Sequence, residues 1–121
     1  MNVKIESIAE QFRVLGEPVR LRILNLLLKA ECGICVCELV DSLNLPQYQI
    51  SRHLKELKQT SLIAGEKEGR WVYYYIVHNE TNSAMVTHLR SILNDPPFDE
   101  DYLKLRDRLS LRQNGKCVIG S

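Results

Sequence analysis

The sequence lacks any apolar run long enough to cross a bilayer, and it carries almost no net charge. Its longest apolar stretch, around residues 23–28, suits a buried helix, because a membrane span needs about 18 consecutive apolar residues. No charged segment followed by an apolar stretch opens the chain, so we expect no signal peptide, no membrane partner and a cytoplasmic location. The formal net charge is only +1, so nucleic-acid binding can be supported only by where the charges lie.

Cysteine is scarce but unevenly placed. Three of the four cysteines, Cys32, Cys35 and Cys37, fall within six residues, and the fourth is Cys117. In a reducing compartment such a cluster indicates metal binding or redox sensing rather than a disulfide framework. Histidine is too sparse for a closed zinc site, because residues 80–93 offer only His88. We also expect no organic cofactor.

Apolar residues recur at intervals of three and four over most of the chain, which predicts helices. The predicted helices are an N-terminal segment that ends at Gly16 and the ranges 19–29, 35–43, 47–59, about 85–93 and 99–112. Pro18 suits the first turn of the second helix, since its missing N–H would have no intrahelical acceptor. Gly33 is the expected left-handed residue after that helix.

Two of the predicted helices, 35–43 and 47–59, are joined by the tight turn Asn44-Leu45-Pro46, which predicts a helix-turn-helix. Residues 62–77 are then rich in β-forming side chains and are interrupted by a turn at residues 67–70. A hairpin that directly follows a helix-turn-helix is the wing of a winged helix.

The predicted fold class is therefore mainly α with a small β-hairpin, a winged helix-turn-helix. With 121 residues the chain has enough material for one hydrophobic core but not for two. We expect a single DNA-binding and dimerisation domain over residues 1–112 and a flexible C-terminal tail over residues 113–121.

The second helix of the pair is polar and basic on its outer face. A helix in the major groove needs side chains that reach base edges, flanked by others that hold phosphates. Gln49 could contact adenine, and Arg52 could contact guanine or phosphate. The predicted DNA contacts are Gln47, Tyr48, Gln49, Ser51, Arg52, His53 and Lys55 in the helix, with Lys67 and Arg70 in the wing.

Four motifs within about residues 12–76 resemble those of a known protein family. They are LGEPVRLRIL at 15–24, CVCEL at 35–39, ISRHL at 50–54 and GRWVYY at 69–74. In this order and spacing the chain resembles the ArsR/SmtB family of metal-sensing repressors, and CVCEL resembles its arsenic-responsive branch. The resemblance implies a winged-helix homodimer whose N- and C-terminal helices form the interface. It also implies repression of a resistance operon that is relieved by metal binding.

The chain departs from the family pattern at two places. Ser61 stands where the family often has glycine before the Leu-Ile step, so the backbone there is expected to differ. Cys32 precedes the Cys-x-Cys pair, whereas the best-known arsenic pattern places its third cysteine after Leu39, where this chain has Val40.

The cysteine cluster suits a soft trivalent ion. Arsenic and antimony in this state favour a trigonal pyramid of three thiolates. We expect Cys32, Cys35 and Cys37 to be the ligands and Cys117 to be a bystander. On an ideal helix Cys35 and Cys37 would point about 200° apart, so the sulfurs converge only if the chain around them is non-helical. Ligation would then distort the start of the helix that supports the recognition helix.

The sequence thus predicts a homodimeric repressor, not an enzyme, that binds an imperfect inverted repeat of operator DNA and is released by trivalent arsenic or antimony. Two alternatives within this class are a cadmium- or lead-responsive repressor and a thiol redox sensor that forms a disulfide from Cys32 to Cys35 or Cys37. A thiol enzyme is disfavoured, because no βαβ pattern surrounds the Cys32–Cys35 spacing. A protein-binding winged helix is disfavoured by the basic side chains at Arg52 and Lys67.

Overall fold

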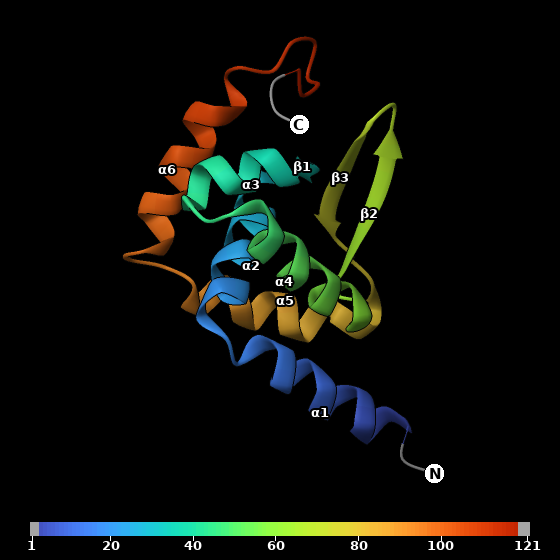
Figure 1. The fold of residues 1–121 in the computed structure, drawn as a ribbon. Coiled ribbons are helices and arrows are strands. Elements are labelled where there is room, and N and C mark those ends of the chain that lie inside the picture. The colour runs from blue at the N-terminus through green and yellow to red at the C-terminus, as the bar shows by residue number, and fades with distance from the viewer. Residues whose placement is uncertain (1–2, 119–121) are drawn as a thin grey trace.

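The computed structural model describes residues 3–118, so the first two residues and the last three of the predicted tail lie outside it. Six helices and one three-stranded antiparallel sheet form the described part of the chain (Figure 1). The helices are α1 (Val3–Leu15), α2 (Pro18–Ala30), α3 (Val36–Leu43), α4 (Gln47–Gln59), α5 (Glu80–Ile92) and α6 (Phe98–Leu109). The strands are β1 (Ile34–Cys35), β2 (Ile63–Glu68) and β3 (Trp71–Ile76). The predicted fold class is confirmed.

The core lies around α2, which packs against α4, α5, α6 and β3. Ile23 and Leu24 of α2 are fully buried, in one cluster with Leu39 of α3, Leu54 of α4 and Leu105 of α6. Burial of side chains of this size stabilises the fold by about 1.5–3 kcal/mol each. Helix α3 packs against both α4 and α6, so its position is set by the core on two sides.

The turn between α3 and α4 is closed by Asn44. This residue is left-handed, with φ of 55°, and its N–H donates to the carbonyl oxygen of Val40 at 2.8 Å. Asparagine is one of the few residue types that adopt this conformation at low cost. Pro46 then directly precedes α4, whose first residue is Gln47. The predicted helix-turn-helix is present with these boundaries.

The predicted wing is the β2–β3 hairpin. Its register runs from Ile63 opposite Ile76 to Glu68 opposite Trp71, and Gly69 in the turn has φ of 63°. On its other side β3 pairs with β1, with Cys35 opposite Tyr73. Strand β1 was not predicted, because two residues are too few to display an alternating pattern. This strand attaches the cysteine segment to the wing.

The end of α2 differs from the prediction. Glu31, with φ of 57°, is the left-handed residue that follows the helix, so the assignment of Gly33 to this role was wrong. Gly33 has a different requirement, because a Cβ at this position would lie 2.7 Å from the Cβ of Tyr73. The close approach of β1 to β3 depends on glycine here.

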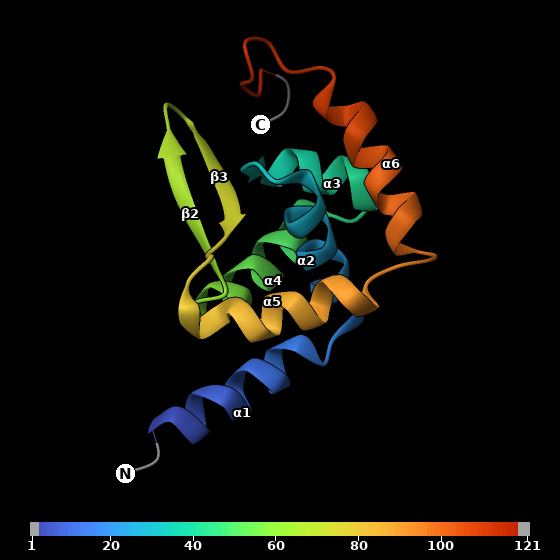
Figure 2. The same ribbon diagram turned by 180° about the vertical axis from the view of Figure 1, so that it is seen from behind.

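The C-terminal segment, residues 110–118, folds back onto the protein. Helix α6 ends at Leu109 rather than at Arg112 as predicted, and Gln113 and Lys116 exchange two backbone hydrogen bonds of 2.9 Å. The two ribbon views place this segment between α6 and the wing (Figures 1 and 2). It includes Cys117, which is buried. The described residues of the predicted tail therefore include one that packs against the domain.

Helix α1 projects from the rest of the protein in both views (Figure 2). Ile5 and Phe12 on this helix are each 62% exposed, and Ile8 is also exposed. An apolar helix face left open to solvent favours association with another surface. Among residues 3–118, none of the helices combines the length and the apolar character that crossing a membrane requires.

Ser61 adopts the conformation that glycine would favour, with φ of 65°. A non-glycine residue in this region costs about 1–2 kcal/mol, and glycine loses about 0.5–1 kcal/mol more chain entropy on folding. We therefore expect Ser61→Gly to raise the free energy of unfolding by about 0.5 kcal/mol in urea denaturation. The control is Ser83→Gly within α5, which should lower it by about 0.5 kcal/mol. A loss of stability in Ser61→Gly would show that the backbone there is unstrained.

Candidate functional site

One side of α4 faces solvent and carries most of the predicted DNA contacts. The exposed side chains are those of Gln47, Tyr48, Ser51, Arg52 and Lys55, and that of Gln49 is half-buried. Neither Arg52 nor Lys55 forms an ion pair with any described residue. Their charges are therefore available to phosphate groups, which supply most of the affinity in protein–DNA contacts.

His53 does not lie on this side, and its prediction as a DNA contact is corrected. It is 4% exposed and shares the inner face of α4 with Ile50, Leu54 and Leu57, because residues three and four apart on a helix are neighbours. Its Nδ1 accepts a hydrogen bond of 3.1 Å from Nε of Arg20. Burial lowers the pKa of His53, so the ring is neutral at neutral pH and belongs to the core.

The wing carries its two predicted contacts near the hairpin turn. Lys67 and Arg70 are both exposed, and the Arg70 guanidinium lies 5.2 Å from the ring centre of Trp71. Glu66 and Glu68 are on the same strand, so the wing is of mixed charge. Phosphate attraction in the wing therefore depends on two individual cations rather than on a basic surface.

Three thiols converge at the N-terminal end of α3. The sulfurs of Cys35, Cys37 and Cys117 all lie within 4.8 Å of one another, and the Sγ atoms of Cys37 and Cys117 are 3.5 Å apart. Cys35 is extended, with φ of −79° and ψ of 160°, and directly precedes the helix that contains Cys37. The chain at Cys35 is therefore non-helical, which is the condition for convergence of the two sulfurs.

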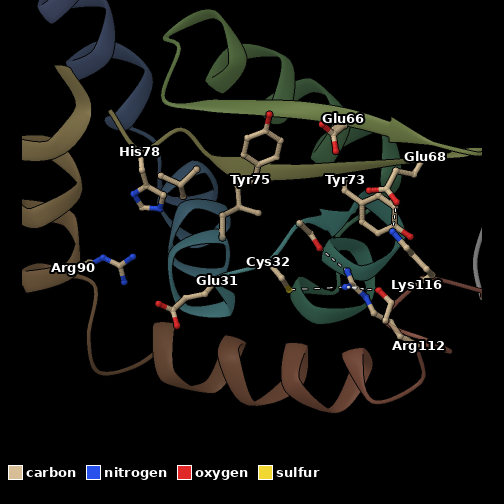
Figure 3. Close-up of a pocket in the computed structure, with 14 residues that line it drawn as sticks. Glu31, Cys32, Glu66, Glu68, Tyr73, Tyr75, His78, Arg90, Arg112 and Lys116 are labelled. Atoms are coloured by element: carbon tan, nitrogen blue, oxygen red, sulfur yellow. Dashed lines mark hydrogen bonds and ion pairs between the residues drawn. The ribbon is translucent and has the colours of Figure 1, made fainter. Parts of the chain in front are cut away.

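Cys32 lies outside this cluster. It is exposed and lines a cavity of about 370 Å³ between the wing and the C-terminal segment, where Figure 3 draws it beside Arg112. The Cys32 Sγ is 4.0 Å from Nη1 of Arg112. Of the predicted ligands, the structure brings Cys35 and Cys37 together, and Cys117 occupies the third place.

A buried ion pair lies next to the cluster. Glu38 is 0% exposed, and its carboxylate accepts hydrogen bonds of 2.6 and 2.7 Å from Arg112. The same carboxylate accepts the N–H of Cys35 at 2.9 Å, and Arg112 also donates to the carbonyl oxygen of Gly33 at 2.7 Å. Burial opposes ionisation of Glu38, but these hydrogen bonds outweigh it and hold the pKa of Glu38 below its usual value. The pair joins the C-terminal segment to the start of α3.

The pKa values of the thiols of Cys35 and Cys37 are shifted in the opposite direction, upward. Burial raises the pKa of Cys37 to about 11, with a contribution from the neighbouring Cys117. Burial also raises the pKa of Cys35 far above its ordinary value, and the Glu38 carboxylate adds to that effect. Both groups are therefore neutral thiols at neutral pH. A ligand for this cluster must either displace protons or carry groups that accept them.

Comparison with known proteins identifies the class. Residues 17–64 match the family described as "Bacterial regulatory protein, arsR family". An uncharacterized HTH-type transcriptional regulator of Methanocaldococcus jannaschii is 49% identical over 75 residues, which are 61% of this chain and 82% of that protein. The chain belongs to the ArsR family. An arsenic resistance transcriptional regulator of Pseudomonas putida is 34% identical over 98 residues, 79% of this chain and 75% of that protein.

Solved structures of transcriptional regulators share the fold of this ArsR-family chain. HlyU from Vibrio cholerae superposes with a TM-score of 0.65 at 27% identity, over 76% of this chain and 97% of that one. The relatives are transcriptional regulators and not enzymes. The chain is accordingly an ArsR-family transcriptional repressor whose helix-turn-helix binds DNA.

Several residues around the ArsR-family cysteine motif were not predicted as part of the site. Glu38 did carry a signal, because it is an acidic residue between the inward-facing Cys35 and Leu39 at the start of a helix. Arg112 and Tyr73 carried no sequence signal that would place them near the cysteines. Cys117 is 80 residues from Cys37 in sequence, and only the return of the C-terminal segment brings it into contact.

Proposed function

We propose that this repressor binds operator DNA as a homodimer and releases it when trivalent arsenic or antimony binds the thiols at the start of α3. The observation that carries the proposal is the position of Cys35 and Cys37, which lie in a cluster of thiols at the start of α3, the helix that packs against the recognition helix α4. Relatives of this chain are named for arsenic or arsenical resistance, which supports the choice of ion.

Operator recognition is proposed for the exposed side of α4 and for the wing. Arg52 and Lys55 would contact phosphates or a guanine edge, and Gln49 an adenine edge, with α4 in the major groove. Lys67 and Arg70 would hold the adjacent backbone. Two such helices about one DNA turn apart require an operator that is an imperfect inverted repeat.

The homodimer is supported by the open apolar face of α1. Ile5, Ile8 and Phe12 lie about one or two turns apart on this helix, and all three are exposed in the single subunit. A two-fold interface that pairs α1 with its copy and with the neighbouring helices would cover them. A two-fold dimer would supply one recognition helix for each half of an inverted repeat.

A second candidate is a redox switch. The Sγ atoms of Cys37 and Cys117 are 3.5 Å apart, which is close enough for a disulfide after a small movement. A peroxide would take two electrons and two protons from the thiols and leave as water. The raised pKa of Cys37 disfavours this route, because the thiolate is the reactive form.

The test is a titration of the reduced protein on fluorescent DNA from upstream of its own gene. Arsenite, antimonite, cadmium, lead, zinc and hydrogen peroxide are added separately, and anisotropy reports release. We expect arsenite and antimonite to release wild-type protein, and Cys35→Ser and Cys37→Ser to remain bound. Arg52→Glu should fail to bind the DNA at all, whereas Glu100→Arg on α6 should bind normally. Retention of the complex in arsenite, with release by another ion or by peroxide, would overturn the arsenic assignment.

A further inference from the structure

The C-terminal segment places a sulfur where a third ligand is needed. A metal–thiolate bond is about 2.3 Å, so sulfurs that share one ion lie about 3.4–3.8 Å apart. The Sγ atoms of Cys37 and Cys117 are already 3.5 Å apart, and all three sulfurs of the cluster lie within 4.8 Å of one another. Closure of the site requires a shift of about one ångström at Cys35, which is within side-chain rotation.

We propose that the inducer is held by Cys35, Cys37 and Cys117 of one subunit. The C-terminal segment then supplies one of the three ligands of the sensor site. This inference rests on the proposed function, because it names the ligand set of the same switch. It replaces Cys32, the third ligand predicted from the sequence, with a residue from the opposite end of the chain. Cys32 remains exposed in the neighbouring cavity.

Several contacts hold the C-terminal segment in the position that the site needs. Arg112 pairs with the buried Glu38, and the backbone N–H of Cys117 donates to the hydroxyl oxygen of Tyr73 at 3.0 Å. The ammonium group of Lys116 pairs with Glu68 of the wing. The segment therefore contacts both α3 and the β2–β3 hairpin. Cys117 is 2% exposed, as expected for a residue that is part of the packed structure.

The environment of the three sulfurs indicates the chemical class of the ligand. Cys35 and Cys117 are buried and Cys37 is half-buried, so a neutral complex is favoured over a charged one at this position. Arsenous acid, As(OH)3, satisfies this condition. Three As–O bonds and three S–H bonds break, three As–S bonds form, and each hydroxide leaves with a thiol proton as water. Arsenic keeps its oxidation state, and no external base or oxidant is needed. The trivalent hydroxide of antimony reacts in the same way.

The position of the cluster also gives the ligand an effect on the DNA-binding surface. Cys35 ends β1 and pairs with Tyr73 of the wing strand β3, while Cys37 lies in the first turn of α3. An ion bound by three sulfurs joins the wing, the supporting helix and the C-terminal segment at one point. Contraction of the cluster would thus move the start of α3 relative to β3. The recognition helix packs on α3, so its position relative to the wing would change with it.

The test compares Cys117→Ser with the matched control Cys32→Ser. X-ray absorption of the arsenite-loaded full-length protein counts the sulfurs around arsenic, and titration of the DNA-free protein gives the affinity. We expect three sulfurs in the wild type and in Cys32→Ser. Cys117→Ser should have two, with an affinity lower by at least about 100-fold, because one of three linked bonds is lost. Normal operator binding by both variants without arsenite would confirm that both are folded.

The outcomes separate this inference from the proposed function. Loss of the third sulfur in Cys32→Ser, or its retention in Cys117→Ser, would overturn the assignment of Cys117 even if arsenite still released DNA. Three sulfurs that include Cys117, without release of the operator, would uphold the ligand set and overturn the proposed function. Failure of the wild type to bind arsenite would overturn both.

Discussion

Arg112→Met should lower the free energy of unfolding by about 3–5 kcal/mol, because it leaves a buried carboxylate without its cationic partner. Glu38 is fully buried, and Arg112 supplies two of the hydrogen bonds that its carboxylate accepts. Urea denaturation at fixed protein concentration measures the change, since the stability of a dimer depends on concentration. Arg106→Met is the matched control. That side chain is 63% exposed, and among residues 3–118 its one ion pair is with the exposed Asp107, so its loss should cost less than about 0.5 kcal/mol.

The same substitution should weaken arsenite binding. Without Arg112 the C-terminal segment loses its ion pair with Glu38 of α3, and we expect Cys117 to be held less firmly beside Cys37. The double variant Arg112→Met/Glu38→Gln removes the unpaired charge and should recover part of the stability without recovering the affinity for arsenite. A variant that keeps wild-type affinity for arsenite would contradict the role given to the segment.

The pH dependence of stability has a definite sign. Because the pKa of Glu38 is lowered in the folded protein, the stabilisation from its ion pair is present above about pH 4.3, the ordinary value of a glutamate. It is lost as the pH falls through the lower, folded value. The wild type should therefore lose stability in acid by more than Arg112→Met does. Equal losses in the two proteins would show that the Glu38 carboxylate is not held in its ionised form by Arg112.

Cadmium binding should strengthen steeply with pH, whereas arsenite binding should change little between pH 6 and pH 8. Cys35 and Cys37 are protonated in this range because burial raises their pKa values. A divalent cation displaces these protons, so the two thiols alone should raise its affinity by about 100-fold per pH unit. Arsenous acid releases water in place of protons. This difference favours the metalloid over divalent metals at neutral pH.

The measurement is a competition titration of cadmium against a chelator of known protonation, in parallel with arsenite titrations across the same pH range. Cys32→Ser should keep the full slope for cadmium, and Cys35→Ser/Cys37→Ser should lose most of it. A cadmium affinity that rises by less than about tenfold per pH unit would show that the thiols are already ionised. An arsenite affinity that rises as steeply as that of cadmium would contradict the water-releasing reaction.

The parts of the fold that depend on local patterning could be predicted from the sequence. The recognition helix over residues 47–59 has a clear period of three and four, with a proline before it, and its predicted bounds are those observed. The hairpin that follows is equally local. His53 was misplaced because a polar side chain was assigned to the outer face, whereas its spacing from Ile50 and Leu57 places it on the inner one.

The candidate site was only partly predictable, because one of its three cysteines is distant in sequence from the other two. Cys35 and Cys37 are separated by one residue and share a motif, so their role could be predicted from the sequence. Cys117 joins them only because α6 packs along α3 and the chain then turns back at residues 113–116. Such a contact depends on the packing of whole elements, and a single sequence carries no periodic signal for it. Spacing alone therefore favoured the nearer Cys32.

Ion binding at the thiols and DNA binding at α4 should oppose each other, and this coupling must act in both directions. Arsenite affinity would be measured for the reduced protein alone and saturated with its operator. We expect operator DNA to weaken arsenite binding by about 10–100-fold, and arsenite to weaken operator binding by the same factor. Equal arsenite affinities with and without the operator would contradict it, because a ligand that binds both states equally cannot release DNA.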